Sequence, residues 1–309
     1  MMHTILNALF LFTVLALTAC DDNDAPEEKP YRFHATMMID GYARTYVLTL
    51  PPDYYDTPEK DFPLVIGMHG TGGSASQFES DYRFADFANE SNFIAVYPEG
   101  VQSNGFLGLR TWNAGTCCDY ALDHQIDDVK FIRELIDDVV ARYNVNPKRV
   151  YATGMSNGGM MAYRLACEIP EKIAAIATVS CSMVVSEPCH PSRAVPILHI
   201  HSMLDTKIPH EGGIGIGGYH FPPIDSVLTA WAVENSCDTP SQIIINNDKY
   251  SFKKWSPCEG NSAIEYYLTK DGGHAWPGGL KSRAKADTPS VAINANELLW
   301  EFFQRFELP

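Results

Sequence analysis

The sequence predicts an α/β fold in which a mostly parallel central sheet carries helices on both faces. The main observation is that short apolar runs alternate along the chain with amphipathic stretches of helical spacing. The composition is that of an ordinary globular protein, because 45% of the 309 residues are hydrophobic and 20% are charged. No repeat of about 20–50 residues and no heptad run is present, which excludes solenoids and coiled coils.

The expected strands are short apolar runs, as is typical of strands that are buried on both faces of a sheet. In chain order they cover residues 62–70, 93–100, 149–155, 173–180, 195–202 and 263–270. The expected helices place their apolar residues along one face and cover residues 125–143, 158–169, 225–235 and 292–306. No domain boundary is apparent after Tyr31, so residues 31–309 are expected to form one domain.

Residues 1–20 are expected to be an export signal rather than part of the fold. Their apolar stretch ends in the letters LTAC, which resembles a bacterial lipoprotein signal, although no Lys or Arg precedes it. This resemblance implies that Cys20 is lipidated and becomes the first mature residue, on the periplasmic face of a membrane or at the cell surface. Residues 21–30 are polar and acidic, and we expect them to form a disordered tether.

The net charge of −15 argues against two classes of partner. Nucleic acids and anionic membrane surfaces both bind basic patches, so we expect no nucleic-acid partner. We expect contact with a membrane only through the lipid anchor at Cys20.

Seven cysteines follow Cys20, in a compartment where disulfides form. Seven is an odd number, so at least one of them is expected to stay free or to pair between chains. No paired C-x-x-C spacing is present, and the adjacent Cys117 and Cys118 are poorly placed to be two ligands of one tetrahedral ion. We therefore expect no metal site.

A candidate nucleophile lies in the stretch YATGMSNGGM, where Gly154-Met155-Ser156-Asn157-Gly158 matches G-x-S-x-G. Ser156 lies between an expected strand and an expected helix, and the flanking glycines allow the sharp turn that exposes a nucleophilic serine. A serine that merely caps the helix fits the same five residues. The two interpretations differ in whether an acid, a base and an oxyanion site accompany the serine.

The candidate acid and base follow Ser156 in the order that serine hydrolases with this turn use, acid first and histidine second. Asp205 comes just past the apolar run 195–202, and His274 lies on a glycine-flanked loop after the run 263–270. Asp225 and Asp271 are less favourably placed as the acid, because one starts a helix and the other is only three residues from His274.

The candidate oxyanion site is the glycine-rich stretch MHGTGGSA after the first expected strand. The expected donors are the backbone N–H groups of Thr71 and of Asn157, which directly follows Ser156. Neither of the common phosphate-binding or dinucleotide-binding glycine patterns is present there, so no cofactor is expected.

A metal-dependent hydrolase is the alternative that the residues themselves suggest. His199 and His201 are two apart on an expected strand and so share one face of it, with Asp205 nearby. This alternative would leave the turn at Ser156 and the glycine-rich stretch without a role. A buried structural role for both histidines is the more economical interpretation.

With these motifs in place, the chain resembles the secreted polyhydroxybutyrate depolymerase and feruloyl esterase group of α/β-hydrolases. The resemblance covers nearly all of residues 31–309 and rests on the segments PLVIGMHGTGGSA, TWNAGTCCD, YATGMSNGGMMAYRLACE, PILHIHSMLDTKIPHEGG and GGHAWPGG. It implies an α/β-hydrolase fold and a serine carboxylic-ester hydrolase without a cofactor. Ser156, Asp205 and His274 would be the triad, with Thr71 and Asn157 as oxyanion donors.

The resemblance also implies roles outside the triad. Trp276 would line the substrate cleft, although packing within the last loop is an equal alternative. Cys237 would pair with Cys258. Independently of the resemblance, we expect Cys117 or Cys118 to be linked to Cys167 or Cys189, with Cys181 as the free thiol. The chain departs from the family pattern at Ser202 and Asp119, where glycine is usual.

The resemblance leaves two substrate classes open. Polymer-degrading members usually carry an additional surface-binding module, which we do not expect here. This favours feruloyl-type or acetyl-type esters of plant polysaccharide fragments, with soluble 3-hydroxybutyrate oligomers as the alternative. The expected partner is therefore a small-molecule or oligosaccharide ester.

Overall fold

The computed structural model describes residues 29–309, and residues 31–309 form one compact unit. The expected lipoprotein signal, Cys20 and most of the expected tether lie outside the described residues. Among residues 29–309, none of the helices has both the length and the apolar character needed to cross a bilayer.

One ten-stranded sheet organises the molecule, with the strand order β1-β2-β4-β3-β7-β8-β9-β14-β13-β12. In chain order its strands are β1 (Arg32–Ile39), β2 (Tyr42–Thr49), β3 (Phe62–Met68), β4 (Ile94–Pro98), β7 (Val145–Met155), β8 (Ala175–Val179), β9 (Ile197–Ser202), β12 (Gln242–Asn246), β13 (Tyr250–Trp255) and β14 (Ile264–Thr269). The six central strands are parallel, and an antiparallel pair closes each edge. The carboxyl ends of the parallel strands therefore meet at one edge, where open α/β sheets bind ligands.

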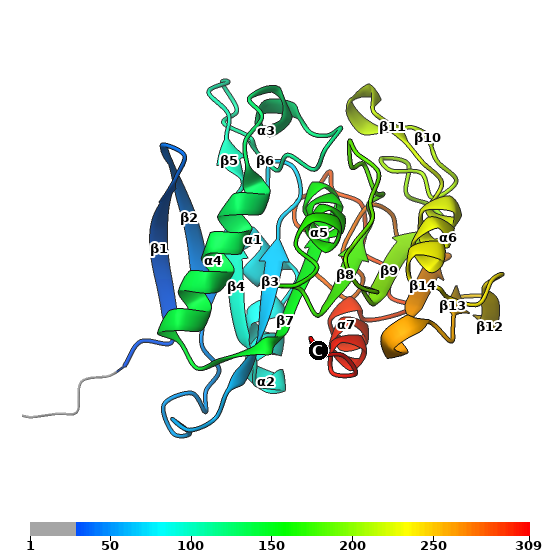
Figure 1. Ribbon diagram of the computed structural model, residues 1–309. Coiled ribbons are helices and arrows are strands. Elements are labelled where there is room, and N and C mark those ends of the chain that lie inside the picture. The colour runs from blue at the N-terminus through cyan, green and yellow to red at the C-terminus, as the bar shows by residue number, and fades with distance from the viewer. Residues whose placement is uncertain (1–28) are drawn as a thin grey trace, which may run out of the picture. The chain divides into compact units, whose positions relative to one another are not determined.

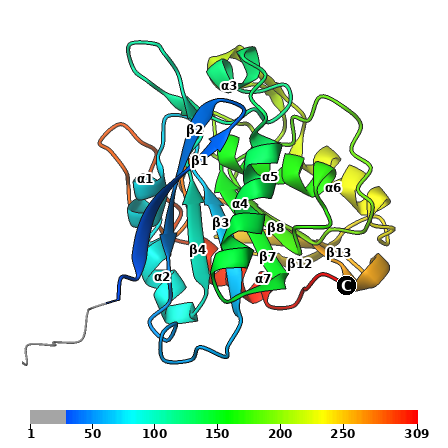
Figure 2. The same ribbon diagram turned by 60° about the vertical axis from the view of Figure 1, so that its left-hand side comes forward.

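Helices cover both faces of this sheet (Figure 1). They are α1 (Ala75–Asp81), α2 (Phe84–Ser91), α3 (Asp119–Asp123), α4 (Asp128–Arg142), α5 (Asn157–Glu168), α6 (Ile224–Glu234) and α7 (Ala295–Phe303), with short 3₁₀ helices at η1 (Ile216–Gly218) and η2 (Glu259–Asn261). Figure 2 shows α4, α5 and α6 on one side and α1 and α2 on the other. The apolar residues of α7 share a core with those of α1 and α2, so α7 covers the same face as they do.

Two separate apolar cores result, one on each face. Along β3, Leu64 and Ile66 belong to the core beneath α4, α5 and α6, whereas Val65 between them belongs to the core beneath α1, α2 and α7. Alternate side chains of a strand point to opposite faces, so a strand covered on both sides has to be apolar at every position. This explains the continuous apolar runs, and the predicted α/β fold with a mostly parallel sheet is confirmed.

The sequence did not predict the strands at the two edges. The first pair, β1 and β2, has a mostly exposed outer strand with alternating burial, and β12 is largely exposed. Two small hairpins also extend from the loops: β5 (Val101–Gln102) with β6 (Arg110–Thr111), and β10 (Gly213–Ile214) with β11 (His220–Phe221). Edge strands bury one face at most and lack the apolar run that marks central strands.

The cysteine pairing differs in part from the expectation. Cys237 is bonded to Cys258, and Cys181 is a buried free thiol. The expected link from Cys117 or Cys118 to Cys167 or Cys189 is wrong, because the adjacent Cys117 and Cys118 are bonded to each other. Cys167 at the end of α5 is bonded to Cys189, and their Cα atoms are 5.2 Å apart, within the range that a disulfide spans.

Candidate active site

Ser156 occupies a sharp turn between β7 and α5. Its backbone angles are φ 55° and ψ −124°, a strained combination for a residue other than glycine. The turn is held by a hydrogen bond from Ser156 N–H to Val179 O on β8 (2.9 Å) and by one from Met160 N–H to Ser156 O (2.9 Å). The half-buried serine is therefore presented at the carboxyl edge of the sheet, directly before the N-terminus of α5.

The two glycines of G-x-S-x-G make this turn possible. A side chain at Gly158 would collide with the carbonyl oxygen of Met68 on β3, and one at Gly154 would collide with the backbone of Gly158. The helix and the two strands thus approach so closely that only glycine fits at both positions. A serine that only caps a helix does not require this close approach of helix and strands. Ser156 also makes no side-chain capping bond to α5, so the capping interpretation is not supported.

The expected oxyanion donors lie on two segments that a buried hydrogen-bond bridge ties together. The Asn157 side chain accepts from Trp112 N–H (2.7 Å) and donates to Trp112 O (2.9 Å), while the Trp112 indole donates to His69 O (2.9 Å). Within residues 29–309, neither Thr71 N–H nor Asn157 N–H has a hydrogen-bond partner. Both donors are therefore available to a developing oxyanion.

His69 stabilises the glycine-rich loop that carries Thr71. Its Nδ1 donates to Gly70 O (2.7 Å), and its Nε2 accepts from Gly100 N–H (3.0 Å). Burial lowers the pKa of His69 to about 4, so the ring is neutral and can make both bonds at once. Sequence reasoning missed His69 because a histidine at the end of a strand carries no signal for such a role.

Asp205 and His274 are in direct contact, although 69 positions separate them in the sequence. The Nδ1 atom of His274 is 2.8 Å from Asp205 Oδ2, and the other carboxylate oxygen accepts from the backbone N–H groups of Lys207 and Ile208 (2.9 Å each). Burial alone would raise the pKa of Asp205, but the hydrogen bond and charge of His274, with His201 and Ile208, outweigh it and lower that pKa. The carboxylate is therefore ionised and can only accept.

The ionised acid fixes the tautomer of His274. Because Asp205 accepts, Nδ1 carries a proton, so the neutral ring has its lone pair at Nε2, which is the form that a general base requires. No hydrogen bond between Ser156 Oγ and His274 is present in the described part of the chain, and Nε2 has no other partner there. Such bonds are often long before a substrate binds.

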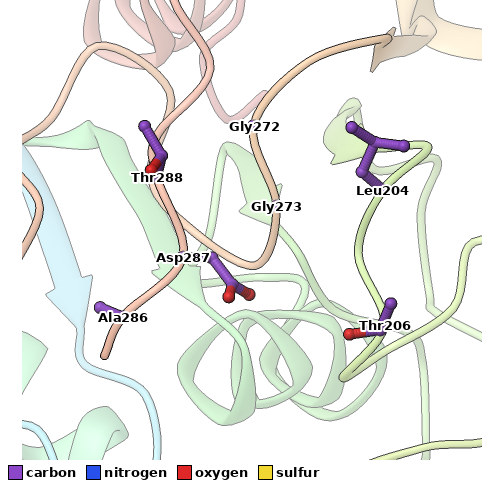
Figure 3. Close-up of a pocket in the computed structure, with 7 residues that line it drawn as sticks. All are labelled: Leu204, Thr206, Gly272, Gly273, Ala286, Asp287 and Thr288. Atoms are coloured by element: carbon purple, nitrogen blue, oxygen red, sulfur yellow. The ribbon is translucent and has the colours of Figure 1, made fainter. Parts of the chain in front are cut away.

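A cavity of about 400 Å³ lies between the loop that carries Asp205 and the loop that carries His274 (Figure 3). It is lined by Leu204, Thr206, Gly272, Gly273, Ala286, Asp287 and Thr288. Its size lies within the usual range for ligand pockets.

Asp287 connects this cavity to the candidate base. Its Oδ2 accepts from His274 N–H (3.0 Å) and from the Lys207 ammonium (3.1 Å). Partial burial would raise the pKa of Asp287, but these two bonds outweigh it and lower that pKa. Sequence reasoning missed this residue, because it lies in a segment without regular structure and its partners are distant in sequence.

Trp276 does not line a cleft, which corrects the role expected from the resemblance. The side chain is only 1% exposed and stacks on Tyr82 at 4.7 Å with nearly parallel rings. Its indole N–H donates to Asn296 Oδ1 (2.9 Å), and Phe78 and Phe84 pack against its edges. The residue belongs to the core beneath α1, α2 and α7, where an aromatic ring with a bonded N–H is stable.

His199 and His201 are buried in β9 and have their ring nitrogens occupied. His199 Nδ1 contacts the hydroxyls of Tyr163 and Thr178, and its Nε2 contacts His201 Nδ1. His201 Nε2 contacts Ile208 O. Residues 29–309 contain no cluster of three or more His, Cys, Asp or Glu side chains that could hold a metal ion.

Comparison with known proteins identifies the family. The profile described as "Esterase PHB depolymerase" matches residues 44–210, which is more than half of the chain. Feruloyl esterase B of Piromyces equi is 30% identical over 86% of this chain, which spans about half (46%) of that relative's length. A probable feruloyl esterase C of Aspergillus niger is 25% identical over 96% of this chain and 98% of its own.

Solved structures support the fold. An acetyl xylan esterase from Aspergillus awamori superimposes with a TM-score of 0.61 at 16% identity, over 88% of this chain and 98% of its own. At this identity the likeness establishes the fold alone, and the predicted α/β-hydrolase fold is confirmed. The predicted family is confirmed as well: the chain belongs to the esterase PHB depolymerase family.

Proposed function

We propose that the protein is a serine carboxylic-ester hydrolase that works through an acyl-enzyme. In this scheme Ser156 is the nucleophile, His274 the general base and Asp205 the acid that orients the base. The observation that carries the proposal is the bond of 2.8 Å between Asp205 and His274, combined with the strained turn at Ser156. Membership of an esterase family and the feruloyl esterase relatives support it.

The chemistry follows from the protonation states. His274 Nε2 takes the proton of Ser156 as its oxygen attacks the ester carbonyl, and Asp205 stabilises the imidazolium that forms. The N–H groups of Thr71 and Asn157 hold the negative charge on the carbonyl oxygen. His274 then protonates the leaving alcohol, and a water molecule repeats the cycle to release the acid. No cofactor takes part in these steps.

The proposed substrates are feruloyl-type or acetyl-type esters of plant polysaccharide fragments. Relatives named feruloyl esterase support this class, and the cavity beside Asp287 has the volume to hold part of such a substrate. The family description itself favours a second candidate, the hydrolysis of 3-hydroxybutyrate oligomers.

We also propose that the protein is exported and held at a membrane by a lipid on Cys20. Three disulfides support export, because such bonds persist in oxidising compartments. The proposed anchor rests on the sequence of residues 1–20 alone.

The test is steady-state hydrolysis of methyl ferulate and of 3-hydroxybutyrate trimer by the protein and by its Ser156→Ala variant. We expect turnover of methyl ferulate, and a loss of about 10⁴-fold or more in kcat in the variant. Turnover of the trimer alone would identify 3-hydroxybutyrate oligomers as the substrate class. A Ser156→Ala variant with full activity would contradict the mechanism.

A further inference from the structure

A chain of hydrogen bonds runs through the core and ends beneath the acid of the site. The hydroxyls of Tyr163 on α5 and Thr178 on β8 are each 2.9 Å from His199 Nδ1. His199 Nε2 is 3.0 Å from His201 Nδ1, and His201 Nε2 is 2.8 Å from Ile208 O. Both imidazoles are at most 1% exposed.

The direction of the bonds that join the two rings to each other and to Ile208 can be derived. A carbonyl only accepts, so His201 Nε2 carries a proton and donates to Ile208 O. Burial lowers the pKa of His201 to about 4 and that of His199 well below its usual value, so both rings are neutral. His201 Nδ1 must then accept from His199 Nε2–H. His199 Nδ1 accepts from a hydroxyl in turn.

The chain ends on the turn that holds the Asp205 carboxylate. Ile208 N–H donates to Asp205 Oδ1 (2.9 Å) while Ile208 O accepts from His201, so one peptide unit on each side of Ile208 is fixed. His201 Nε2 also lies 3.5 Å from Asp205 Oδ2, the oxygen that accepts from His274 Nδ1. Burying two imidazole rings costs desolvation free energy, which two aliphatic side chains in the same space would not cost. The hydrogen bonds of the rings are therefore the reason to look for a role.

We propose that His201, oriented by His199, is a positioning residue that fixes the Asp205 turn and thereby aligns the Asp205–His274 pair. The inference rests on the proposed function, since it concerns the alignment of its acid and base. His201 does not touch the substrate. It acts through Ile208 and Asp205, and the hydroxyls of Tyr163 and Thr178 set the orientation of the ring behind it.

Two substitutions at His201 separate the two ends of its ring. Gln keeps a donor near the Nε2 position, facing Ile208 O, and loses the acceptor for His199. Asn keeps an acceptor near the Nδ1 position and loses the donor to Ile208. We expect His201→Asn to lower kcat about 10-fold to 100-fold with KM unchanged, and His201→Gln to retain most of the activity. The exposed His190→Asn is the matched control and should leave kcat unchanged.

A double-mutant cycle tests whether the effect passes through the acid. In an Asp205→Asn background we expect His201→Asn to lower kcat by less than about twofold, because the group that it positions is already lost. An equal loss in both backgrounds would overturn the proposal, since a general weakening of the fold would be additive. Wild-type kcat in His201→Asn would overturn it as well.

A measurement on the unmodified protein covers the case in which His201→Asn does not fold. The ¹⁵N chemical shifts of the imidazoles report the tautomers, and we expect Nε2–H for both His199 and His201 and Nδ1–H for His274. Nδ1–H at His201 would overturn the proposal. Failure of the proposed function is a separate outcome, because it requires that Ser156→Ala keep full activity.

Discussion

The two halves of the site are held in place by different means. Ser156 is fixed by its immediate neighbours, because Gly154 and Gly158 allow β7 and α5 to meet in a turn that no larger residues permit. Asp205 and His274 come from two loops, 69 positions apart, that side-chain and backbone hydrogen bonds hold together. The nucleophile thus depends on steric fit, whereas the acid–base pair depends on a polar network.

This difference predicts how each half fails. A steric turn is disrupted by any added atom, which costs stability and activity together. A polar network can lose one donor while the fold persists, so activity falls far more than stability. Substitutions in the two halves should therefore separate on a plot of kcat against the free energy of unfolding.

The largest expected effect is on the polar side, at Asp205. Asp205→Asn should lower kcat about 10⁴-fold, because an amide that donates to His274 favours the tautomer with no lone pair for Ser156. Steady-state kinetics on methyl ferulate measures this loss. The exposed Asp225→Asn is the control, since it removes a carboxylate that pairs with Lys253 on β13, away from His274. Equal activity in the two variants would show that Asp205 is not the acid.

Acid should lower the stability of the fold through two buried histidines, His69 beside the glycine-rich loop and His201 beneath Asp205. Burial lowers the pKa of His69 and of His201 to about 4, against an unfolded value near 6.5. Between these values the unfolded chain binds protons that the folded chain excludes, so stability is complete above pH 6.5 and declines towards pH 4. The decline corresponds to about 3 kcal/mol for each histidine. A Tm that stays constant between pH 7 and pH 5 would contradict this account.

On the steric side, Gly158→Ala should lower the free energy of unfolding by about 1–3 kcal/mol and reduce activity with it. Its new methyl group would collide with the carbonyl oxygen of Met68, which is backbone and cannot swing away. Gly105→Ala is the control, because its methyl group would meet only Ser103 Oγ at an ordinary 3.7 Å. Urea denaturation measures both changes, and equal stabilities would remove the steric explanation.

The smallest expected effect is at Ser202, the last residue of β9. Its hydroxyl donates to Asp271 O (3.0 Å) and accepts from Leu204 N–H (3.0 Å), so it joins the loops of Asp205 and His274. Ser202→Ala should lower kcat by up to about tenfold, the equivalent of one neutral hydrogen bond. The control is Ser182→Ala, which removes the hydrogen bond that Ser182 Oγ donates to Pro222 O and should leave kcat unchanged. A wild-type kcat in Ser202→Ala would show that the link is dispensable.

The same contrast explains what could be predicted from the sequence. The central strands, the main helices and the turn at Ser156 depend on local patterns, namely apolar runs, helical spacing and G-x-S-x-G. The positions of Asp205 and His274 after strands were predicted from chain order, and the structure places the two side chains in contact.

What could not be predicted depends on contacts between distant segments. The positions of Asp287, His69 and Ser202 carry no local signal, because their partners lie far away or belong to the backbone. Trp276 follows the candidate base by two residues, yet its ring turns into the core to stack on Tyr82. Disulfides usually join cysteines whose Cα atoms lie farther apart than those of neighbouring residues. Nothing in the sequence therefore indicated the bond between the adjacent Cys117 and Cys118.

The most direct test of the central claim is covalent labelling of the nucleophile. The protein is treated with a fluorophosphonate, digested and analysed by mass spectrometry, with Ser156→Ala treated in parallel. We predict one adduct per chain, on the peptide that contains Ser156, and none in the variant at an unchanged Tm. Labelling of Ser156→Ala to the same extent, together with wild-type ester hydrolysis, would contradict the assignment of Ser156 as the nucleophile.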